Sequence, residues 1–381
     1  MADPSPSTSF EPGNLLVRGV NWLGDAVMTT PAMLRLRQRF PQSRITLLTS
    51  EKLADLWRQH SAIDRVITFG KSDNPWSIAR RLRSDAFDAT LVLPNSPRSA
   101  LETWLARIPQ RIGYAGKWRN WLLTRPLKYP SDRLRLHRRK VREVKRLIRA
   151  GNQPVSSAVP RLHQMHDYLD LAAALGADPT PVPPNLELSA AEIETGVAFL
   201  SQVVRGQSLE TGGQGVAWLG VNPSTAYGAA KRWPIERFSQ VACEISRRVP
   251  NSLWLAFGTD ADWELCEQLV SQGPGRILNL AGKTSLRQLM GLLKACRLLL
   301  TNDSGPMHVA AALGTPVIVP FGSTSPELTA PGQPGDPRHH LLRSHVPCSP
   351  CFRRTCPIDF RCMTGISVDQ VLAAILETIP G

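Results

Sequence analysis

One acidic residue follows the turn after the first apolar run of the chain. In "VRGVNWLGDAVMTTPAM" (17–33), Gly24 permits a tight turn and Asp25 comes directly after it. Thr30 and Pro31 predict the N-cap and the first residue of the next helix, which leaves Asp25 in the loop before it. A nearby helix N-terminus stabilises a carboxylate, so Asp25 suits two roles, a helix-capping side chain or a general base. The residues alone leave both roles open.

A second candidate site lies in "NPSTAYGAAKRWP" (222–234), where small residues, two hydroxyl groups and a lysine precede a helix. Backbone N–H groups, hydroxyls and a cation in one loop are typical of a diphosphate cradle. The segment has neither the G-x-x-x-x-G-K-[ST] order of a P-loop nor the G-x-G-x-x-G of a dinucleotide fold. We therefore expect a nucleotide bound differently from those of P-loop ATPases and NAD enzymes. The candidate ligands are Ser224, Thr225 and Lys231.

Two further loops carry acids and a histidine. In "TNDSGPMHVAAALG" (301–314), Asp303 and His308 lie near the start of a helix expected from Pro306 to Gly314, and a helix start favours an anion. His308 alone would be an ordinary histidine on a helix face, but its place beside a second phosphate-binding loop favours a functional role. The segment "FGTDADWE" (257–264) offers acids that could hold a ribose hydroxyl, and spacing does not choose among them. These acids are Asp260, Asp262 and Glu264.

Apolar runs that alternate with amphipathic segments must position these loops. This alternation predicts parallel sheets with helices on both faces, and ligands bind beyond the carboxyl ends of such strands. The pattern restarts after residue 215, and the proline-rich stretch 176–189 reads as a linker. We therefore expect a disordered tail (1–13) and two α/β domains, 14–180 and 181–381. The predicted strands are 14–20, 44–50, 65–70, 89–95, 216–221, 252–257, 276–280, 296–302 and 316–322.

The charge of the chain predicts an anionic partner. Its 381 residues carry 45 Lys and Arg against 31 Asp and Glu, a formal net charge of +14. Much of this charge lies in 132–152, which reads either as a solvated basic helix or as a patch for phosphate groups of a membrane or a nucleic acid. No zinc-finger, helix-turn-helix or RNP-type motif is present, so nucleic acid is not the expected partner. No apolar run of about 18 residues and no signal peptide is found, which predicts a cytoplasmic protein.

Four of the seven cysteines crowd into one C-terminal segment, with C-x2-C-x4-C-x5-C spacing. Four thiolates at this spacing could hold a structural zinc ion. Free buried thiols and a disulfide pair are the alternatives, and metal analysis would separate them. The four residues are Cys348, Cys351, Cys356 and Cys362.

Taken together, "NWLGDAVMTTPAM", "LPNSPRSALETWLARIPQRIGYAG", "GAAKRWP" and "TNDSGPMHVAAALGTPVIVPFGSTSPE" resemble the bacterial lipopolysaccharide heptosyltransferases, glycosyltransferase family 9. The resemblance covers the chain from about residue 14 to 330, with the motifs in the same order. It implies a GT-B fold, in which two Rossmann-like domains face each other across a cleft. The N-terminal domain would hold the acceptor, and the C-terminal domain the nucleotide sugar.

The resemblance also implies the reaction, in which a heptose moves from ADP-heptose with inversion and without a cofactor. Asp25 matches the family's general base, and Lys231 the lysine that binds the diphosphate. Thr284 falls where the chain passes the adenine, and Asp262 best matches the ribose ligand. The implied donor contacts are Ser224, Thr225, Lys231, Asp262, Thr284, Asp303, Ser304, Gly305 and His308. The candidate acceptor contacts are Asn95, Ser96, Arg98 and Arg111.

Within the family, the likeness favours the branch that adds the second heptose of the inner core, so the expected acceptor is heptosyl-Kdo2-lipid A. Another family 9 transferase, adding the first heptose or extending the core, is the alternative. The acceptor is an anionic lipid, which gives the +14 charge a reason: peripheral attachment to the inner face of the inner membrane.

Overall fold

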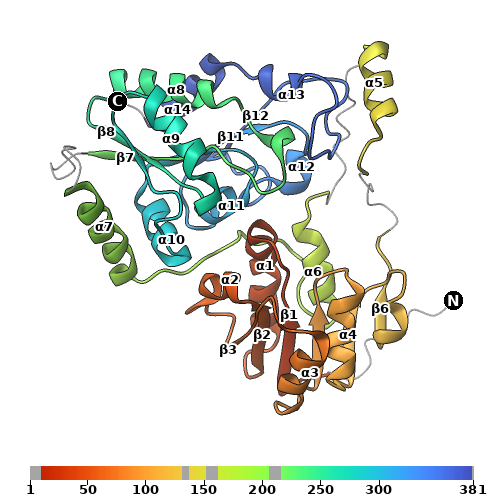
Figure 1. The fold of residues 1–381 in the computed structure, drawn as a ribbon. Coiled ribbons are helices and arrows are strands. Elements are labelled where there is room, and N and C mark those ends of the chain that lie inside the picture. The colour runs from red at the N-terminus through yellow and green to blue at the C-terminus, as the bar shows by residue number, and fades with distance from the viewer. Residues whose placement is uncertain (1–9, 131–136, 152–161, 206–215, 380–381) are drawn as a thin grey trace. The chain divides into compact units, whose positions relative to one another are not determined.

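The computed structural model describes residues 10–130, 137–151, 162–205 and 216–379 (Figure 1). The chain divides into two compact units: Met1–Arg133 with Gln164–Val182, and Leu134–His163 with Pro183–Gly381. The domains expected from the sequence, 14–180 and 181–381, differ from these units mainly in Leu134–His163, which groups with the second unit. Residues 1–9 of the expected disordered tail lie outside the described residues.

The first unit is built on a six-stranded parallel sheet in the order β3-β2-β1-β4-β5-β6. This is the strand order of a Rossmann fold, with its switch point between β1 and β4. Three short helices complete it: α2 (Glu51–Ala54), η1 (Asp55–Trp57) and η2 (Asn120–Leu122). Its strands and longer helices are β1 (Asn14–Arg18), α1 (Leu23–Arg39), β2 (Arg44–Ser50), β3 (Arg65–Phe69), α3 (Pro75–Arg83), β4 (Ala89–Val92), α4 (Pro97–Leu105), β5 (Gln110–Tyr114), β6 (Arg125–Leu127) and α6 (Met165–Ala173).

Helix α1 begins earlier than the sequence predicted. It starts at Leu23, so Asp25 is the third residue of the helix and neither its N-cap nor a loop residue. Pro31 lies inside the helix, where it cannot donate the backbone hydrogen bond that the Val27 carbonyl would accept. The Thr30 hydroxyl donates to that carbonyl instead, at 2.8 Å. The prediction that Thr30 and Pro31 start the helix was therefore wrong, because a side-chain bond replaces the missing backbone bond.

The second unit repeats the architecture, with a parallel sheet ordered β12-β11-β10-β7-β8-β9. Its switch point lies between β7 and β10. Its strands are β7 (Ala217–Asn222), β8 (Ser252–Ala256), β9 (Ile277–Asn279), β10 (Leu298–Thr301), β11 (Val317–Phe321) and β12 (His340–Arg343). Its helices are α5 (Val141–Ala150), α7 (Ala190–Arg205), η3 (Ala229–Lys231), α8 (Ile235–Arg248), η4 (Asp260–Asp262), α9 (Trp263–Gln272), α10 (Leu286–Ala295), α11 (Gly305–Ala312), α12 (Pro326–Thr329), α13 (Arg361–Thr364) and α14 (Val368–Thr378).

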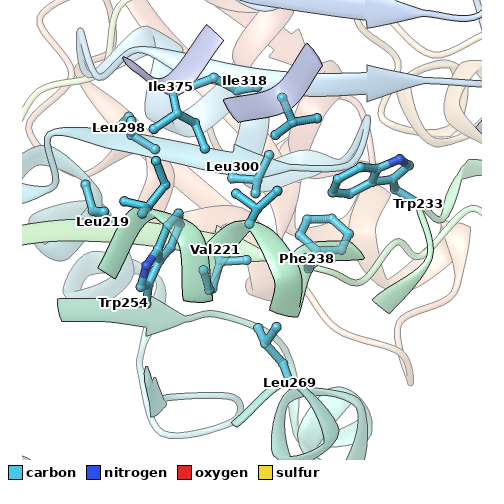
Figure 2. Close-up of a cluster of buried hydrophobic side chains, with 14 of the residues drawn as sticks. Leu219, Val221, Trp233, Phe238, Trp254, Leu269, Leu298, Leu300, Ile318 and Ile375 are labelled. Atoms are coloured by element: carbon cyan, nitrogen blue, oxygen red, sulfur yellow. The ribbon is translucent and has the colours of Figure 1, made fainter. Parts of the chain in front are cut away.

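Burial of apolar side chains explains why the second sheet forms. Figure 2 shows Leu219, Val221, Leu298 and Leu300 of the central strands beside large aromatic side chains of the same cluster. All four leucine and valine side chains are almost inaccessible to solvent. Strands buried on both faces read as continuous apolar runs, which is how the sequence identified them.

The sequence predicted the nine strands above but not β5, β6 or β12, which lie toward the outer edges of the two sheets. Helix α11 spans Gly305–Ala312, slightly displaced from the predicted range of Pro306 to Gly314. No helix in the described part of the chain is long and apolar enough to span a lipid bilayer.

Candidate active site

A cavity of about 270 Å³ lies at the carboxyl ends of β1, β4 and β5 in the first unit. Asp25 reaches it from the first turn of α1. The loop after β4 contributes Asn95 and Ser96. Helix α6, which lies much later in the chain, contributes Asp167 and Tyr168. This is the edge of a parallel sheet at which ligands bind. The lining consists of Val20, Asn21, Trp22, Asp25, Leu93, Pro94, Asn95, Ser96, Tyr114, Gln164, Asp167 and Tyr168.

A buried phenol lies close to Asp25. Burial raises the pKa of Tyr168 well above its ordinary value, and the charge of Asp25 raises it further. Tyr168 is therefore protonated near neutral pH. Gln164 donates to its hydroxyl oxygen at 2.8 Å, which orients the phenol. An acid next to a protonated phenol in a partly enclosed cavity can accept a proton from a bound hydroxyl group.

Asn95 is held in place by two neighbours. Its side-chain amide donates to the Tyr129 hydroxyl, and its Oδ1 accepts from Arg119 Nη1 at 3.3 Å. Arg119 is 1% exposed, and burial lowers its pKa. The Tyr129 ring stacks on Tyr114 with centroids 4.0 Å apart. This packing fixes the position of the amide beside the cavity. Ser96, by contrast, is the N-cap of α4 and accepts from a backbone N–H at 3.2 Å.

The structure does not bring Arg98 or Arg111 to this cavity. Arg98 donates to the Asp73 carbonyl at 2.6 Å and pairs with Glu102 at 3.2 Å. Arg111 lies near the start of β5, whereas Tyr114, which lines the cavity, lies at its other end. Its guanidinium donates to the carbonyls of Leu122 and Ile108, and burial lowers its pKa. These contacts support the sheet and α4, so an acceptor contact by either arginine has no support in this arrangement.

In the second unit, a lysine and a buried acid meet where β7 and β10 end. Lys231 closes the short turn η3, and its Nζ lies 2.6 Å from Asp303 Oδ2. Asp303 is only 4% exposed. The Thr324 hydroxyl, from the loop after β11, donates to the same oxygen at 2.5 Å. Three loops therefore converge on one carboxylate, which positions the ammonium group of Lys231.

Asn302, which follows β10, is hydrogen-bonded to the loop after β7. Its Nδ2 donates to the Pro223 carbonyl at 2.7 Å, and its Oδ1 accepts from the Trp233 backbone N–H at 2.9 Å. Ser224 is buried and donates through both N–H and hydroxyl to Asn222 Oδ1. The Thr225 hydroxyl accepts from a backbone N–H two residues on. Ser224 and Thr225 thus shape the loop through their own hydrogen bonds.

His308 lies on α11, with its side chain buried beside the acid. Burial lowers the pKa of His308 to about 4, although the charge of Asp303 acts in the opposite direction. The imidazole is therefore neutral near pH 7 and can act as a hydrogen-bonding group. Ser304 is the N-cap of α11, with its hydroxyl 3.2 Å from that of Thr301, and Gly305 is the first residue of the helix.

Asp262 ends the short helix η4 after β8, and Thr284 lies in the segment after β9. The Asp262 carboxylate accepts from Thr259 N and Oγ1 at 2.8 and 2.7 Å, so it caps its own turn. The Gly282 N–H donates to the Gly258 carbonyl at 3.0 Å and joins this turn to the one containing Thr284. The turn that precedes Asp262 and the turn that precedes Thr284 are therefore neighbours in the second unit.

The C-terminal cysteines are buried or half-buried, and all are free thiols. Burial, together with the charges of the neighbouring cysteines, raises the pKa of Cys362 to about 12. Across the described residues, no group of three or more His, Cys, Asp or Glu side chains is placed to hold a metal ion. A structural zinc ion held by Cys348, Cys351, Cys356 and Cys362 therefore stays a prediction, which metal analysis of the purified protein would test.

The sequence missed several residues of both sites. Tyr168 and Arg119 belong to none of the quoted motifs, because each reaches the first site through packing of distant segments, and Tyr114 lies within the quoted segment 93–116 but was not selected. Thr324 could have been found, since it follows a predicted strand in the same way as the other site loops. Tyr227 lies within the quoted loop 222–234 but was not selected.

Two Rossmann-like units, one with an acid in a cavity and one with a lysine paired with a buried acid, define an α/β protein with the domain type of GT-B glycosyltransferases. The model of glycosyltransferase family 9 (heptosyltransferase) matches residues 75–148 and 135–360. The chain belongs to this family and is a glycosyltransferase.

Among its relatives, the lipooligosaccharide heptosyltransferase 2 of Haemophilus ducreyi is 30% identical over 331 residues, which span 83% of this chain and 85% of that protein. The lipopolysaccharide heptosyltransferase 2 of Salmonella typhimurium is 28% identical over 332 residues, again 83% and 85%. The solved structure of Escherichia coli ADP-heptose lipopolysaccharide heptosyltransferase II has a TM-score of 0.73 at 24% identity, covering 96% of this chain and 98% of that one. These solved coordinates support the fold described above.

Proposed function

We propose that this chain transfers L-glycero-D-manno-heptose from ADP-heptose to the first heptose of the lipopolysaccharide inner core, with inversion and without a cofactor. The relatives named heptosyltransferase 2 support this choice of substrates. The observation that carries the proposal is the position of Asp25, which lines the cavity of the first unit beside the protonated phenol of Tyr168.

In the proposed reaction, the acceptor hydroxyl occupies the cavity of the first unit. Asp25 takes its proton as the hydroxyl oxygen attacks the anomeric carbon of the heptose. The bond from that carbon to the β-phosphate oxygen breaks, and ADP leaves with the electron pair. Lys231 stabilises the charge that develops on the leaving group. Asp262 and Thr284 would hold the adenosine, and Asp303, Ser304, Gly305 and His308 the phosphates and the sugar.

An ADP-release assay with defined acceptors tests the proposal. Purified protein receives ADP-heptose together with either Kdo2-lipid A or heptosyl-Kdo2-lipid A. We expect turnover only with the heptosylated acceptor, and one added heptose in the mass spectrum of the product. Turnover on Kdo2-lipid A, the acceptor without heptose, would assign the chain to the addition of the first heptose. If no ADP were released with either acceptor, the proposal would be contradicted.

We also propose that helix α5 attaches the protein to the anionic inner face of the inner membrane. Its apolar side chains Val144 and Ile148 pack against Cys348 and Cys351, so this face of the helix is occupied. The other face exposes basic side chains, each contributing about 1 kcal/mol near an anionic lipid surface. The exposed residues are Arg142, Lys145, Arg146 and Arg149.

Sedimentation with lipid vesicles tests this attachment. The double variant Arg146→Gln/Arg149→Gln should bind vesicles containing phosphatidylglycerol about thirtyfold more weakly than the wild type. The double variant Arg247→Gln/Arg248→Gln removes the same charge from α8 and serves as the control. Equal binding by both variants would contradict the proposal. Arg139 is left unchanged, because it hydrogen-bonds the Pro347 carbonyl at 3.2 Å and supports the fold.

A further inference from the structure

A segment from Cys348 to Met363, here called the C-terminal strap, supports the loop after β11. The backbone N–H groups of Cys351 and Phe352 both donate to the Ser323 carbonyl, at 3.0 and 2.7 Å. The Ser349 hydroxyl donates to the Gly322 carbonyl at 2.7 Å. The strap therefore holds the loop that carries Thr324, the hydrogen-bond donor to Asp303.

The strap also holds the loop after β7. The Tyr227 hydroxyl donates to the Phe352 carbonyl at 2.8 Å, and the Ala230 N–H donates to the Arg354 carbonyl at 3.0 Å. Gly228 has a φ of +143°, and a Cβ there would lie 2.5 Å from the Arg354 carbonyl oxygen. Backbone of the strap is thus packed directly on the loop that leads to Lys231.

Two cations from these segments lie over one aromatic ring. Lys231 Nζ is 4.7 Å from the centroid of Tyr227, and Arg354 Cζ is 5.6 Å from it. The charge of Arg138 also acts on the Tyr227 phenol. The Arg354 side chain therefore contacts the same aromatic ring as the lysine of the candidate diphosphate site, although 123 positions separate the two in the sequence.

The charges at this site indicate a need for a further cation. Lys231 is paired with the buried carboxylate of Asp303 at 2.6 Å, so the pair by itself has no net charge. A diphosphate is multiply anionic, and its departure adds charge that must be stabilised. Arg354 is exposed, and within the described ranges its guanidinium has no carboxylate at ion-pair distance. Its positive charge is therefore uncompensated beside the loop.

We propose that Arg354 of the C-terminal strap is a donor-binding residue whose guanidinium contacts the diphosphate of the nucleotide sugar next to Lys231. The inference rests on the proposed function for the identity of the donor. Guanidinium groups bind phosphate oxygens through two parallel charge-assisted hydrogen bonds, which a single ammonium group cannot do. The strap thereby contributes charge to the site as well as support to its loops.

Nucleotide binding by calorimetry tests the role of Arg354. The variant Arg354→Gln keeps the backbone carbonyl that holds the loop and removes only the guanidinium. We expect the Kd of ADP to rise about tenfold, the Kd of AMP to change less than about twofold, and Arg354→Lys to be intermediate. Arg361→Gln is the matched control, because Arg361 lies on the same strap but is paired with Asp359 at 2.7 Å.

Each outcome bears on the inference. An equal effect of Arg354→Gln and Arg361→Gln on ADP binding would overturn it, as would an equal loss of ADP and AMP binding, which indicates a structural effect. If the wild type preferred UDP or GDP to ADP, while Arg354→Gln still weakened that diphosphate more than its monophosphate, the diphosphate contact would stand and the ADP-heptose donor would be wrong. Absence of binding to every nucleoside diphosphate would overturn both.

Discussion

The two switch points of this protein share their topology and differ in their chemistry. Each lies where the order of a six-stranded parallel sheet reverses, between β1 and β4 or between β7 and β10. The first gathers an acid and phenols around a cavity, whereas the second combines a lysine, a buried acid and a neutral imidazole. Strand order therefore determines where a ligand binds, and the loop side chains determine which ligand and which step.

In the proposed reaction Asp25 of the first site takes the proton, so Asp25→Asn should have the largest effect. The amide keeps the shape of the side chain but cannot accept the proton, so we expect kcat to fall about a thousandfold. The Kd of ADP, measured by calorimetry, should not change. Asp55→Asn, which removes another acid of the same unit, is the control. Joint loss of ADP binding and kcat in Asp25→Asn would break the division between the sites.

Lys231→Gln at the second site should lower both kcat and ADP binding, in contrast to Asp25→Asn, which should lower kcat alone. We expect kcat to fall about a hundredfold, because the leaving group loses its nearest cation, and ADP binding to weaken as well. Lys294→Gln removes a lysine of the same unit that donates to the Leu313 carbonyl, and it should leave both quantities near those of the wild type. Normal ADP affinity in Lys231→Gln would place this lysine outside the donor site.

The buried imidazole of the second site should make stability depend on pH. The folded-state pKa of His308 is about 4 and its ordinary value is 6.5, so between these pH values the unfolded state binds a proton that the folded state does not. The free energy of unfolding should therefore fall as the pH falls from 6.5 to 4, by at most about 3 kcal/mol from this residue.

Urea denaturation across this pH range measures the effect. His308→Gln should show a flatter pH dependence, whereas His137→Gln, which removes a histidine with a 73% exposed side chain, should keep the slope of the wild type. Identical slopes in all three proteins would contradict the assignment of a neutral, buried His308.

The smallest effect is expected at the contact between the Lys231 loop and the C-terminal strap. The φ of Gly228 is unfavourable for alanine, and the added Cβ of Gly228→Ala would clash with the Arg354 carbonyl. The variant should therefore lose about 2 kcal/mol of stability and bind ADP more weakly. Gly275→Ala is the matched control, since its φ is +72° but no atom lies within 4 Å of its added Cβ. Thermal denaturation compares the two, and equal costs would show that the clash contributes nothing.

Much of the fold could be predicted because its strands are fully buried. Continuous apolar runs such as 216–221 and 296–302 have few alternatives to a central parallel strand. Strands β5, β6 and β12 were missed because their positions away from the sheet centre bury less, so their sequences are less uniformly apolar. The start of α1 was misplaced because the side-chain bond from Thr30 that tolerates Pro31 cannot be read from residue type.

The loops that follow buried strands could be identified from the sequence itself, together with the candidate residues Asp25, Lys231, Asp303 and His308 in or shortly after them. Residue type and local spacing suffice for such loops, since parallel strands all end at one edge of their sheet. Only the tertiary structure decided that Arg98 and Arg111 bond to carbonyls of the framework, that Tyr168 lines the first cavity, and that Arg354 lies against the loop of Tyr227. Their roles depend on contacts between segments far apart in the chain, and local sequence patterns carry no information on such contacts.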